Sequence, residues 1–330
     1  MKILVMDMKY PRLLLLSVLS WFTQLNDVQA QQDPQFSLFM YNQLYYNPAT
    51  AGADGTTRFQ LLNRMQWQGY QTTSGDGGAP NTLVFSGSVP LNFIKSAVGI
   101  NYVNDRIGAM GSQEVQLSSA YRMNINDNTL ALGARVGFQN RYIDFSRLVS
   151  REPGDPLIPA GRLGVTQPDI SLGVFYDAST FYIGASVNHL NKPKFNLGVD
   201  AGNSILAPNA YLTAGYRWEP LYGLEIQPLV LVKSLLGFSP RTLSVEGGVM
   251  ATWDEWVFGG VTYRVNESYN ILAGINLLGN RSLRLAGAVD LLGGSRSAKA
   301  PASYEFMVSY ALPALTKGKK TIIRTPRFRY

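Results

Sequence analysis

The stretch LALGARVGFQ, which runs from residue 130 to residue 139, places two kinds of side chain in alternation. Its even-numbered residues are all apolar, whereas its odd-numbered residues include two glycines, Arg135 and Gln139. Successive side chains of a β-strand point to opposite faces, so this period of two predicts a strand. An apolar face opposite a polar, glycine-containing face is typical of a membrane-barrel strand, which has lipid outside and a wet lumen inside.

The same alternation recurs along most of the chain, for example in residues 181–188 and 242–253. We count about fourteen such segments of roughly ten residues and predict an all-β fold, a transmembrane antiparallel β-barrel of about 14 strands. The predicted strands are 57–69, 81–90, 96–104, 113–123, 129–140, 168–177, 180–188, 208–218, 223–233, 241–252, 256–265, 269–277, 282–291 and 303–312.

The connections between these segments tend to alternate in length. Long or glycine-rich connections occur at 70–80, 141–167, 189–207 and 292–302, and short ones at 124–128, 178–179, 219–222, 253–255 and 278–281. Bacterial barrels have short periplasmic turns and longer outer loops, so we predict that the long connections face outward.

A soluble β-sandwich also alternates, but it buries one face of each strand in a dry core. Here the less apolar faces carry many charged residues, and charges are costly to bury unpaired. The barrel is therefore the favoured fold. The charged residues on these faces are Arg58, Arg64, Glu114, Arg122, Arg135, Glu225, Glu246, Arg264, Arg284, Asp290 and Glu305.

The composition argues against catalysis. Charged residues make up 15% of the chain, below the roughly 25% usual for soluble domains. The chain has no cysteine and one histidine, His189, which leaves too few side chains for a disulfide framework, a zinc site or a histidine-based triad. We expect no enzyme activity, no cofactor, no metal site and no nucleic-acid partner.

Residues 1–30 have the pattern of a secretory signal peptide. Lys2, Lys9 and Arg12 precede the ten apolar and small residues 13–22, and a small-residue cleavage pattern ends at Ala30. A membrane-spanning helix needs about 20 apolar residues. We therefore predict cleavage after Ala30 and location in the outer membrane of a Gram-negative bacterium. Translation could begin at Met1 or at Met8, since residues 8–12 give a more usual amino-terminal region.

Two segments fall outside the strand pattern, so the chain divides into the signal peptide (1–30), a non-barrel segment (31–56), the barrel (57–312) and a basic tail (313–330). The non-barrel segment is rich in aromatic residues, and the spacing of Phe36 and Met40 predicts a short helix after Asp33 and Pro34, capped by Asp33. Two interpretations stay open, a plug or periplasmic lid and a recognition segment for a partner.

The basic tail also has two interpretations, a solvated terminus and a periplasmic docking segment. Its positive residues are Lys317, Lys319, Lys320, Arg324, Arg327 and Arg329.

Four stretches of the chain resemble the PorP/SprF family of the type IX secretion system. They are the start QDPQFS with MYN and YNPATAG (32–37, 40–42 and 46–52), the middle PDISLGV with YIGASV and NHLNKP (168–174, 182–187 and 188–193), the last strand SYEFMVSY (303–310), and the end TPRF (325–328). Tyr304 stands where the family pattern has histidine. His189 matches the pattern, either as a recognition contact or as a satisfied histidine at the barrel rim.

The resemblance implies a non-catalytic outer-membrane barrel that supports export or surface anchoring of a cognate secreted protein, often a large adhesin of the gliding type. The implied partners are the C-terminal domain of the cargo, periplasmic and outer-membrane components of the secretion and gliding machinery, and outer-membrane lipid. The alternative is a passive porin or a transporter of hydrophobic substrates. The candidate partner-binding residues are Asp33, Pro34, Phe36, Met40, Asn42, Asn47, Pro48, His189, Pro193, Lys317, Lys319, Lys320, Arg324 and Arg327.

Overall fold

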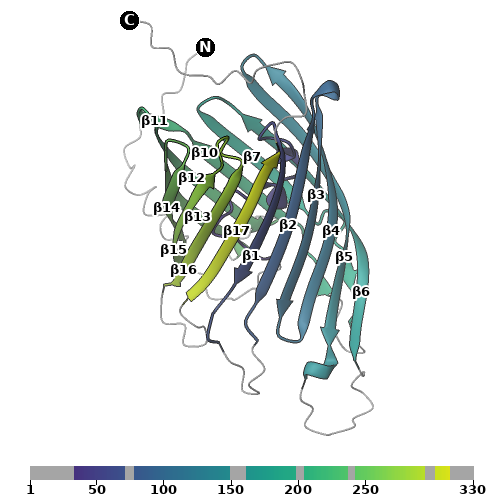
Figure 1. The fold of residues 1–330 in the computed structure, drawn as a ribbon. Coiled ribbons are helices and arrows are strands. Elements are labelled where there is room, and N and C mark those ends of the chain that lie inside the picture. The colour runs from purple at the N-terminus through teal and green to yellow at the C-terminus, as the bar shows by residue number, and fades with distance from the viewer. Residues whose placement is uncertain are drawn as a thin grey trace, which may run out of the picture.

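The computed structural model describes residues 33–70, 78–148, 161–197, 204–236, 242–293 and 302–312. In this part of the chain, antiparallel strands form a barrel around a segment that precedes them in the sequence (Figure 1). The barrel strands are β1 (Thr57–Met65), β2 (Asn81–Leu91), β3 (Ser96–Ile107), β4 (Met110–Ile125), β5 (Asn128–Asp144), β6 (Arg162–Asp177), β7 (Phe181–Asn188), β10 (Asn209–Tyr216), β12 (Leu224–Leu235), β13 (Ser244–Trp253), β14 (Val257–Arg264), β15 (Ser268–Leu277), β16 (Leu283–Leu292) and β17 (Ala302–Leu312).

The barrel closes at two places. β1 pairs with β17 along its whole length, from Thr57 opposite Leu312 to Met65 opposite Tyr304. β10 pairs with β12, which completes the ring. The short strand β11 (Trp218–Leu221) belongs to the same 15-stranded sheet but pairs only with β12, so fourteen of these strands form the closed ring. The predicted fold and strand number are confirmed. A separate two-stranded sheet joins β8 (Lys194–Phe195) and β9 (Ser204–Ile205).

The two faces of the strands point where the alternation predicts. In β5 the side chains of Leu132, Val136 and Phe138 are exposed on the outer face, whereas Arg135 and Gln139 are buried. Seven of the eleven charged residues predicted on the inner face are buried, and the other four are half-buried. The seven are Arg64, Glu114, Arg135, Glu246, Arg264, Asp290 and Glu305.

The long connections follow strand ends at one end of the ring, which also has the short turns 108–109 and 265–267, and the other short turns lie at the opposite end. Residues 66–80, 145–161, 189–208 and 293–301 follow or precede strand ends on one side, which we call the outer end. The turns at 126–127, 178–180 and 254–256 lie on the other side, the periplasmic end, as does the terminus of β17. The predicted grouping of the long connections at one end is seen, and their facing outward stays a prediction. In Figure 1 the strands β4, β5 and β6 extend furthest at the outer end, and β11 lies at the periplasmic end.

Residues Asp33–Gly55, which we call the luminal segment, fill the interior of the barrel. The segment contains one four-residue helix, α2 (Gln43–Tyr46), and one 3-10 turn, η1 (Pro48–Thr50). Phe36, Leu38 and Ala49 are completely buried. No helix among the described residues has the length and apolar character needed to cross a bilayer.

The predicted helix after Asp33 and Pro34 is wrong. Residues 37–41 form turns instead, and the helix begins only at Gln43. The reason is competition from the barrel wall, because the backbone amides of Ser37 and Leu38 donate to the carboxylate of Glu305. The side chain of Asp33 accepts hydrogen bonds from the barrel and not from the first turn of a helix.

Candidate functional site

The luminal segment crosses the lumen from the outer end to the periplasmic end. At its start, Asp33 contacts Lys233 near the outer end of β12. Near its finish, Gly52 lies against Pro90 and Ala97, at the periplasmic ends of β2 and β3. The positive φ of Gly52, 65°, is a backbone conformation that glycine adopts without strain. The segment then leads directly into β1, so it is a plug covalently joined to the first strand.

Asp33 holds the start of the plug through several strands at once. Its Oδ2 atom accepts hydrogen bonds from Asn209 Nδ2 at 2.7 Å and Tyr211 Oη at 2.8 Å, and lies 3.1 Å from His189 Nε2. Its backbone oxygen accepts from Lys233 Nζ at 2.8 Å. The carboxylate thus joins the end of β7 to β10, and the backbone oxygen of the same residue adds β12, so one residue contacts three neighbouring parts of the wall.

His189 lies between two carboxylates. Its Nδ1 atom is 2.9 Å from Asp169 Oδ1, and its Nε2 atom faces Asp33. Burial alone lowers the pKa of His189, but the two aspartates outweigh this effect and raise it to about 10. Burial raises the pKa of Asp33, but the charge and hydrogen bond of His189, helped by Lys233, leave it well below the ordinary value. The imidazole is therefore protonated at neutral pH, and both its N–H groups donate.

The backbone at His189 also ends strand β7. His189 has a positive φ of 59°, which is uncommon for a residue with a side chain. Beyond it, Leu190 donates its amide to Ile170 O, and the Asn191 side chain bonds both Ile170 N and Pro168 O. His189 is thus 3% exposed and held by partners on both sides, rather than lying free at the rim.

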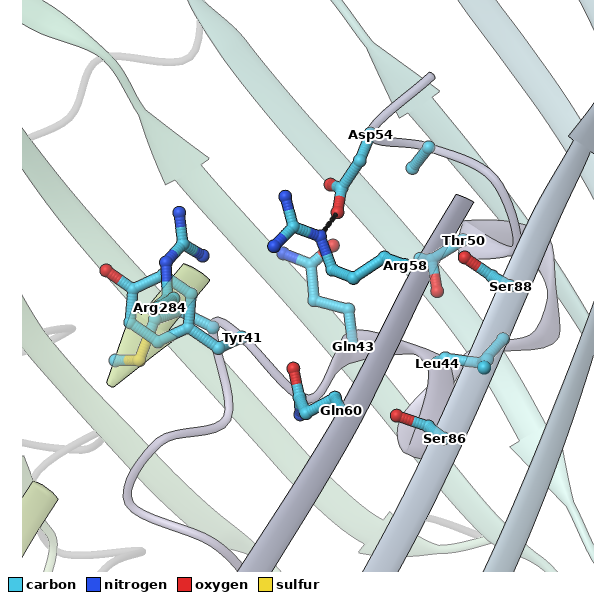
Figure 2. A pocket seen from close by; sticks show the side chains of 13 residues that line it. Tyr41, Gln43, Leu44, Thr50, Asp54, Arg58, Gln60, Ser86, Ser88 and Arg284 are labelled. Carbon is cyan, nitrogen blue, oxygen red and sulfur yellow. Dashed lines mark hydrogen bonds and ion pairs between the residues drawn. The ribbon is translucent and has the colours of Figure 1, made fainter. Parts of the chain in front are cut away.

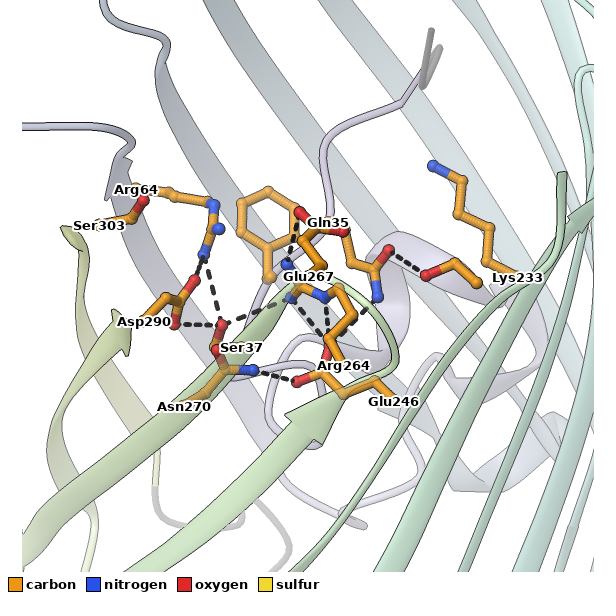
Figure 3. Close-up of polar contacts among 12 residues, drawn as sticks. Gln35, Ser37, Arg64, Lys233, Glu246, Arg264, Glu267, Asn270, Asp290 and Ser303 are labelled. Atoms are coloured by element: carbon orange, nitrogen blue, oxygen red, sulfur yellow. Dashed lines mark hydrogen bonds and ion pairs between the residues drawn. The ribbon is translucent and has the colours of Figure 1, made fainter. Parts of the chain in front are cut away.

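A second polar cluster holds Ser37 (Figure 3). The Glu305 carboxylate accepts from the backbone amides of Ser37 and Leu38 at 2.7 and 2.9 Å. Ser37 Oγ donates to Asp290 Oδ1 at 2.6 Å. Arg64 pairs with both Glu305 and Asp290, so the two buried carboxylates share a cation. Buried charges of this kind are tolerated because each is paired and hydrogen-bonded.

Gln35 joins the plug to the nearby strands β13 and β14. Its amide nitrogen donates to Glu246 Oε2 at 3.1 Å, and the same oxygen lies 2.8 Å from Arg264 Nη2. Arg264 Nη1 also lies 3.4 Å from Glu267. Figure 3 shows that these residues are connected to the Ser37 cluster, because Arg264 Nη2 also donates to Ser37 Oγ at 3.5 Å.

Glycines in the wall make room for the middle of the plug. A Cβ atom at Gly133 of β5 would collide with the backbone of Pro48 and Ala49, and one at Gly173 of β6 would collide with the side chain of Asn47. Asn47 Nδ2 donates to Val174 O at 2.9 Å. The plug can lie against the strand backbones here only because these wall residues have no side chain.

Arg135 satisfies the carbonyl groups at the end of helix α2. It donates to the backbone oxygens of Leu44 and Tyr45 and to Ser118 Oγ. The guanidinium is 1% exposed and replaces the hydrogen bonds that these carbonyls lack at a helix end.

Two cavities lie beside the plug, toward the periplasmic end of the barrel. One cavity of about 90 Å³ is bordered by Tyr41, Gln43 and Arg284, with Arg58 paired to Asp54 at 2.5 Å (Figure 2). A second of about 440 Å³ has charged residues of both signs in its lining, among them Asp177, Arg217 and Glu225. This mixture suits water and polar chain segments better than a hydrophobic solute.

The predicted site residues of the N-terminal segment all lie in the plug. Asp33, Phe36, Met40, Asn42, Asn47 and Pro48 are buried, and Pro34 is half-buried. Pro193 is also buried, and its carbonyl accepts from Leu206 N. A role of these residues in binding a partner stays a prediction. Lys317, Lys319, Lys320, Arg324 and Arg327 lie outside the described residues, as do Gln31, Gln32 and the signal peptide.

The plug partners on the wall are residues that sequence reasoning did not assign to a site. Asp169, Asn209, Tyr211 and Lys233 contribute to the Asp33 cluster, but they lie 136 to 200 positions from Asp33. One signal was present, because Asp169 and His189 both fall within the second stretch that resembles the family pattern. We expected the charged side chains on the inner faces of the strands to contact water in the lumen. Several of them contact the plug instead.

A family model for the type IX secretion system membrane protein PorP/SprF matches residues 28–310. The chain belongs to the PorP/SprF family. The match includes the plug and thirteen complete barrel strands, and it ends within β17. Both halves of the Asp33–His189 contact therefore lie inside the region that defines this PorP/SprF protein as a secretion-system membrane component.

No curated protein matches this PorP/SprF chain. Among solved structures, similar barrels include a Pseudomonas aeruginosa FadL homologue, with 14% identity, a TM-score of 0.46 and coverage of 80% of this chain and 92% of that one. The P. putida toluene transporter TodX gives 10% identity, a TM-score of 0.48 and coverage of 82% and 93%. The Acinetobacter baumannii outer membrane protein Omp33 gives 8% identity, a TM-score of 0.43 and coverage of 78% of this chain and 99% of that one.

Proposed function

We propose that this PorP/SprF protein is a closed, non-catalytic outer-membrane barrel that supports the export or surface anchoring of one cognate secreted protein, of the adhesin or gliding type. The observation that carries this proposal is the plug. A porin needs a continuous aqueous path, whereas here residues 33–51 run through the lumen and their polar groups bond to the wall from β1 to β17.

In this proposal the barrel acts as a scaffold. The connections at the outer end receive the C-terminal domain of the cargo, and the basic tail meets periplasmic components of the secretion machinery. The signal peptide is cleaved after Ala30, which makes Asp33 the third residue of the mature chain. The plug keeps the barrel rigid and sealed while these contacts form.

Gene deletion and conductance separate this role from the alternative of a porin or hydrophobic-substrate transporter. Deletion is expected to abolish surface display of one secreted protein and to leave uptake of small solutes unchanged. The purified barrel in a planar bilayer is expected to conduct little. Reduced solute uptake with normal display, together with a large steady conductance, would favour the porin.

The tail is tested by truncation. Removal of residues 317–330 is expected to leave the barrel inserted and to weaken its copurification with periplasmic machinery. The matched control replaces Lys317, Lys319 and Lys320 by arginine, which keeps the charge. If the truncated protein retains its partners in full, the docking role of the tail is wrong.

A further inference from the structure

Strand β6 has a backbone edge at the outer end that the neighbouring strand leaves uncovered. β5 pairs with β6 along its whole length, from Asp144 opposite Arg162 to Thr129 opposite Asp177. On its other side, β6 pairs with β7 only from Leu172 to Asp177. Among the described strands, none pairs with residues 162–171 on that side. β8 lies near β6 but pairs with β9, and Leu190 and Asn191 bond Ile170 and Pro168, so the uncovered stretch is 162–167.

The direction of the backbone groups along this edge follows from the contacts at Ile170. Its N–H donates to the Asn191 side chain and its carbonyl accepts from Leu190, so both groups point away from β5. Backbone groups of a strand point to the same side at every second residue. Thr166, Gly164 and Arg162 therefore also direct their N–H and carbonyl groups to the uncovered side, and all three residues are exposed.

Pro168 supports this assignment. Proline has no N–H group, so within a sheet it is confined to positions where the missing donor faces an edge. Pro168 occupies such a position, because its N atom would face the same uncovered side as that of Ile170, and its carbonyl accepts from Asn191 Nδ2 at 2.6 Å.

The uncovered edge lies beyond the lipid. The outward residues of β5 are apolar from Leu130 to Phe138. For a strand tilted by about 40°, this band is roughly 21 Å high, close to the apolar band of outer-membrane barrels. The next row outward is polar and crosses four paired strands. It consists of Asn104, Gln113, Asn140 and Thr166, with hydrogen bonds from Gln113 to Asn104 and from Asn140 to Thr166.

In the part of this region that the structure describes, the exposed charges nearest the edge are positive. Arg162 is exposed and lies 3.3 Å above the ring of Tyr142. Lys192 and Lys194 are exposed in the connection that continues from Asn191. The nearest described carboxylate on the β5 side, Asp144, already bonds Ser146 and pairs with Arg147. An incoming chain that carries acidic residues is therefore favoured over a basic one.

We propose that residues 162–167 of β6 accept an extended, acidic segment of the secreted partner as an added β-strand outside the membrane. This inference rests on the proposed function, because it takes the partner to be a protein displayed by the secretion system. Main-chain bonds to Arg162, Gly164 and Thr166 hold the segment, and its alternate side chains pack beside Leu163 and Val165.

The test replaces one backbone donor. Thr166→Pro removes the N–H that faces the edge and leaves the pairing with β5 intact, whereas the control Thr166→Ala keeps this N–H. Gly164→Pro repeats the test if Thr166→Pro does not insert, as judged by the heat-dependent mobility of the barrel in gels. A photo-crosslinking amino acid at Gln167, combined with each variant, reports contact in living cells.

We expect crosslinks to a secreted protein whose surface display also depends on this gene. The proline variants should reduce both the crosslinks and the display about tenfold, the effect of about 1.4 kcal/mol, and Thr166→Ala should reduce neither. Crosslinks to a second copy or to residues of the same chain overturn the inference, as do proline variants with normal display. If gene deletion itself leaves the surface display unchanged, the proposed function is wrong. If deletion abolishes the display but the proline variants leave it unchanged, only the proposed strand addition is wrong.

Discussion

His189 Nε2 lies 3.1 Å from Asp33 Oδ2, although 156 positions separate the two residues. The contact joins the start of the plug to the end of β7, and Asp169 holds the other side of the imidazole at 2.9 Å. The contact brings together residues 32–37 and 188–193, two separate stretches that resemble the family pattern.

Loss of either partner should loosen the plug. His189→Gln removes the cation between two buried aspartates, and Asp33→Asn removes one of the two carboxylates beside the imidazole. Breaking a buried pair costs about 3–5 kcal/mol. We expect a lower thermal unfolding midpoint in detergent and faster proteolysis near residue 33. Lys192→Ala, an exposed neighbour, should change stability by less than about 0.5 kcal/mol. Equal stability of wild type and His189→Gln would contradict the anchoring role.

The contribution of this contact should depend on pH. The pKa of His189 is raised from 6.5 to about 10, so its stabilisation is complete below about pH 6.5 and is lost as the pH rises through about 10. The pKa of Asp33 is lowered from 3.8, so its stabilisation is present above about pH 4 and is lost as the pH falls. The contact should therefore stabilise most between about pH 4 and 6.5.

The quantity to measure is the difference in unfolding midpoint between wild type and His189→Gln at pH 5.5, 8 and 10.5. Subtracting the variant removes most of the effect of the other ionisable groups near the imidazole, which are Asp169, Lys233, Tyr211 and Glu114. If this difference in unfolding midpoint grows between pH 5.5 and 10.5, the predicted direction of the pH dependence is wrong.

Gly133→Val should displace the plug. The new side chain would occupy the space of the Pro48 and Ala49 backbone, so the middle of the plug cannot stay in contact with β5. We expect the barrel to insert but to show increased bilayer conductance. The matched control is Ala134→Val, one residue along, whose side chain faces lipid. Equal, low conductance of both variants would mean that the plug adapts to the added side chain.

Glu305→Gln should weaken the second anchor. Ser37 and Leu38 donate to different oxygens of Glu305, so the single amide oxygen of glutamine can accept from only one of them, and its NH2 group faces the other N–H. The side chain also no longer pairs with Arg64, which keeps only Asp290. We expect a loss of about 1–3 kcal/mol, the cost of leaving a buried donor without an acceptor. Phe306→Leu on the lipid-facing side of the same strand is the control. Chemical unfolding in detergent measures both.

The orientation can be tested by cysteine labelling, because the chain has no cysteine of its own. Arg147→Cys lies in a connection at the outer end, and Asn280→Cys lies in a turn at the periplasmic end. A membrane-impermeant maleimide should label only Arg147→Cys in intact cells and both variants in broken cells. The reverse pattern in intact cells would invert the assignment of the two ends.

Much of the fold could be predicted from residues close together in the sequence. The alternation in residues 130–139 decided which side chains face lipid, and the connection lengths decided which turns share an end. The helix after Asp33 could not be judged in this way, because its amides bond to Glu305, about 270 positions away. Local spacing is informative only where local hydrogen bonds are the ones that form.

The sequence by itself therefore determined that this protein is a closed β-barrel with charged inward faces, because the two-residue period of a strand is a local property. Only the tertiary structure decided that the lumen holds the chain's own N-terminal segment and that His189 is a buried, protonated anchor and not a rim residue. Barrel closure brings β6, β7, β10 and β12 around Asp33. Charges buried there are stable only when they are paired and hydrogen-bonded, because burial removes their hydration. Such partners are fixed by position in space, which the order of residues does not reveal.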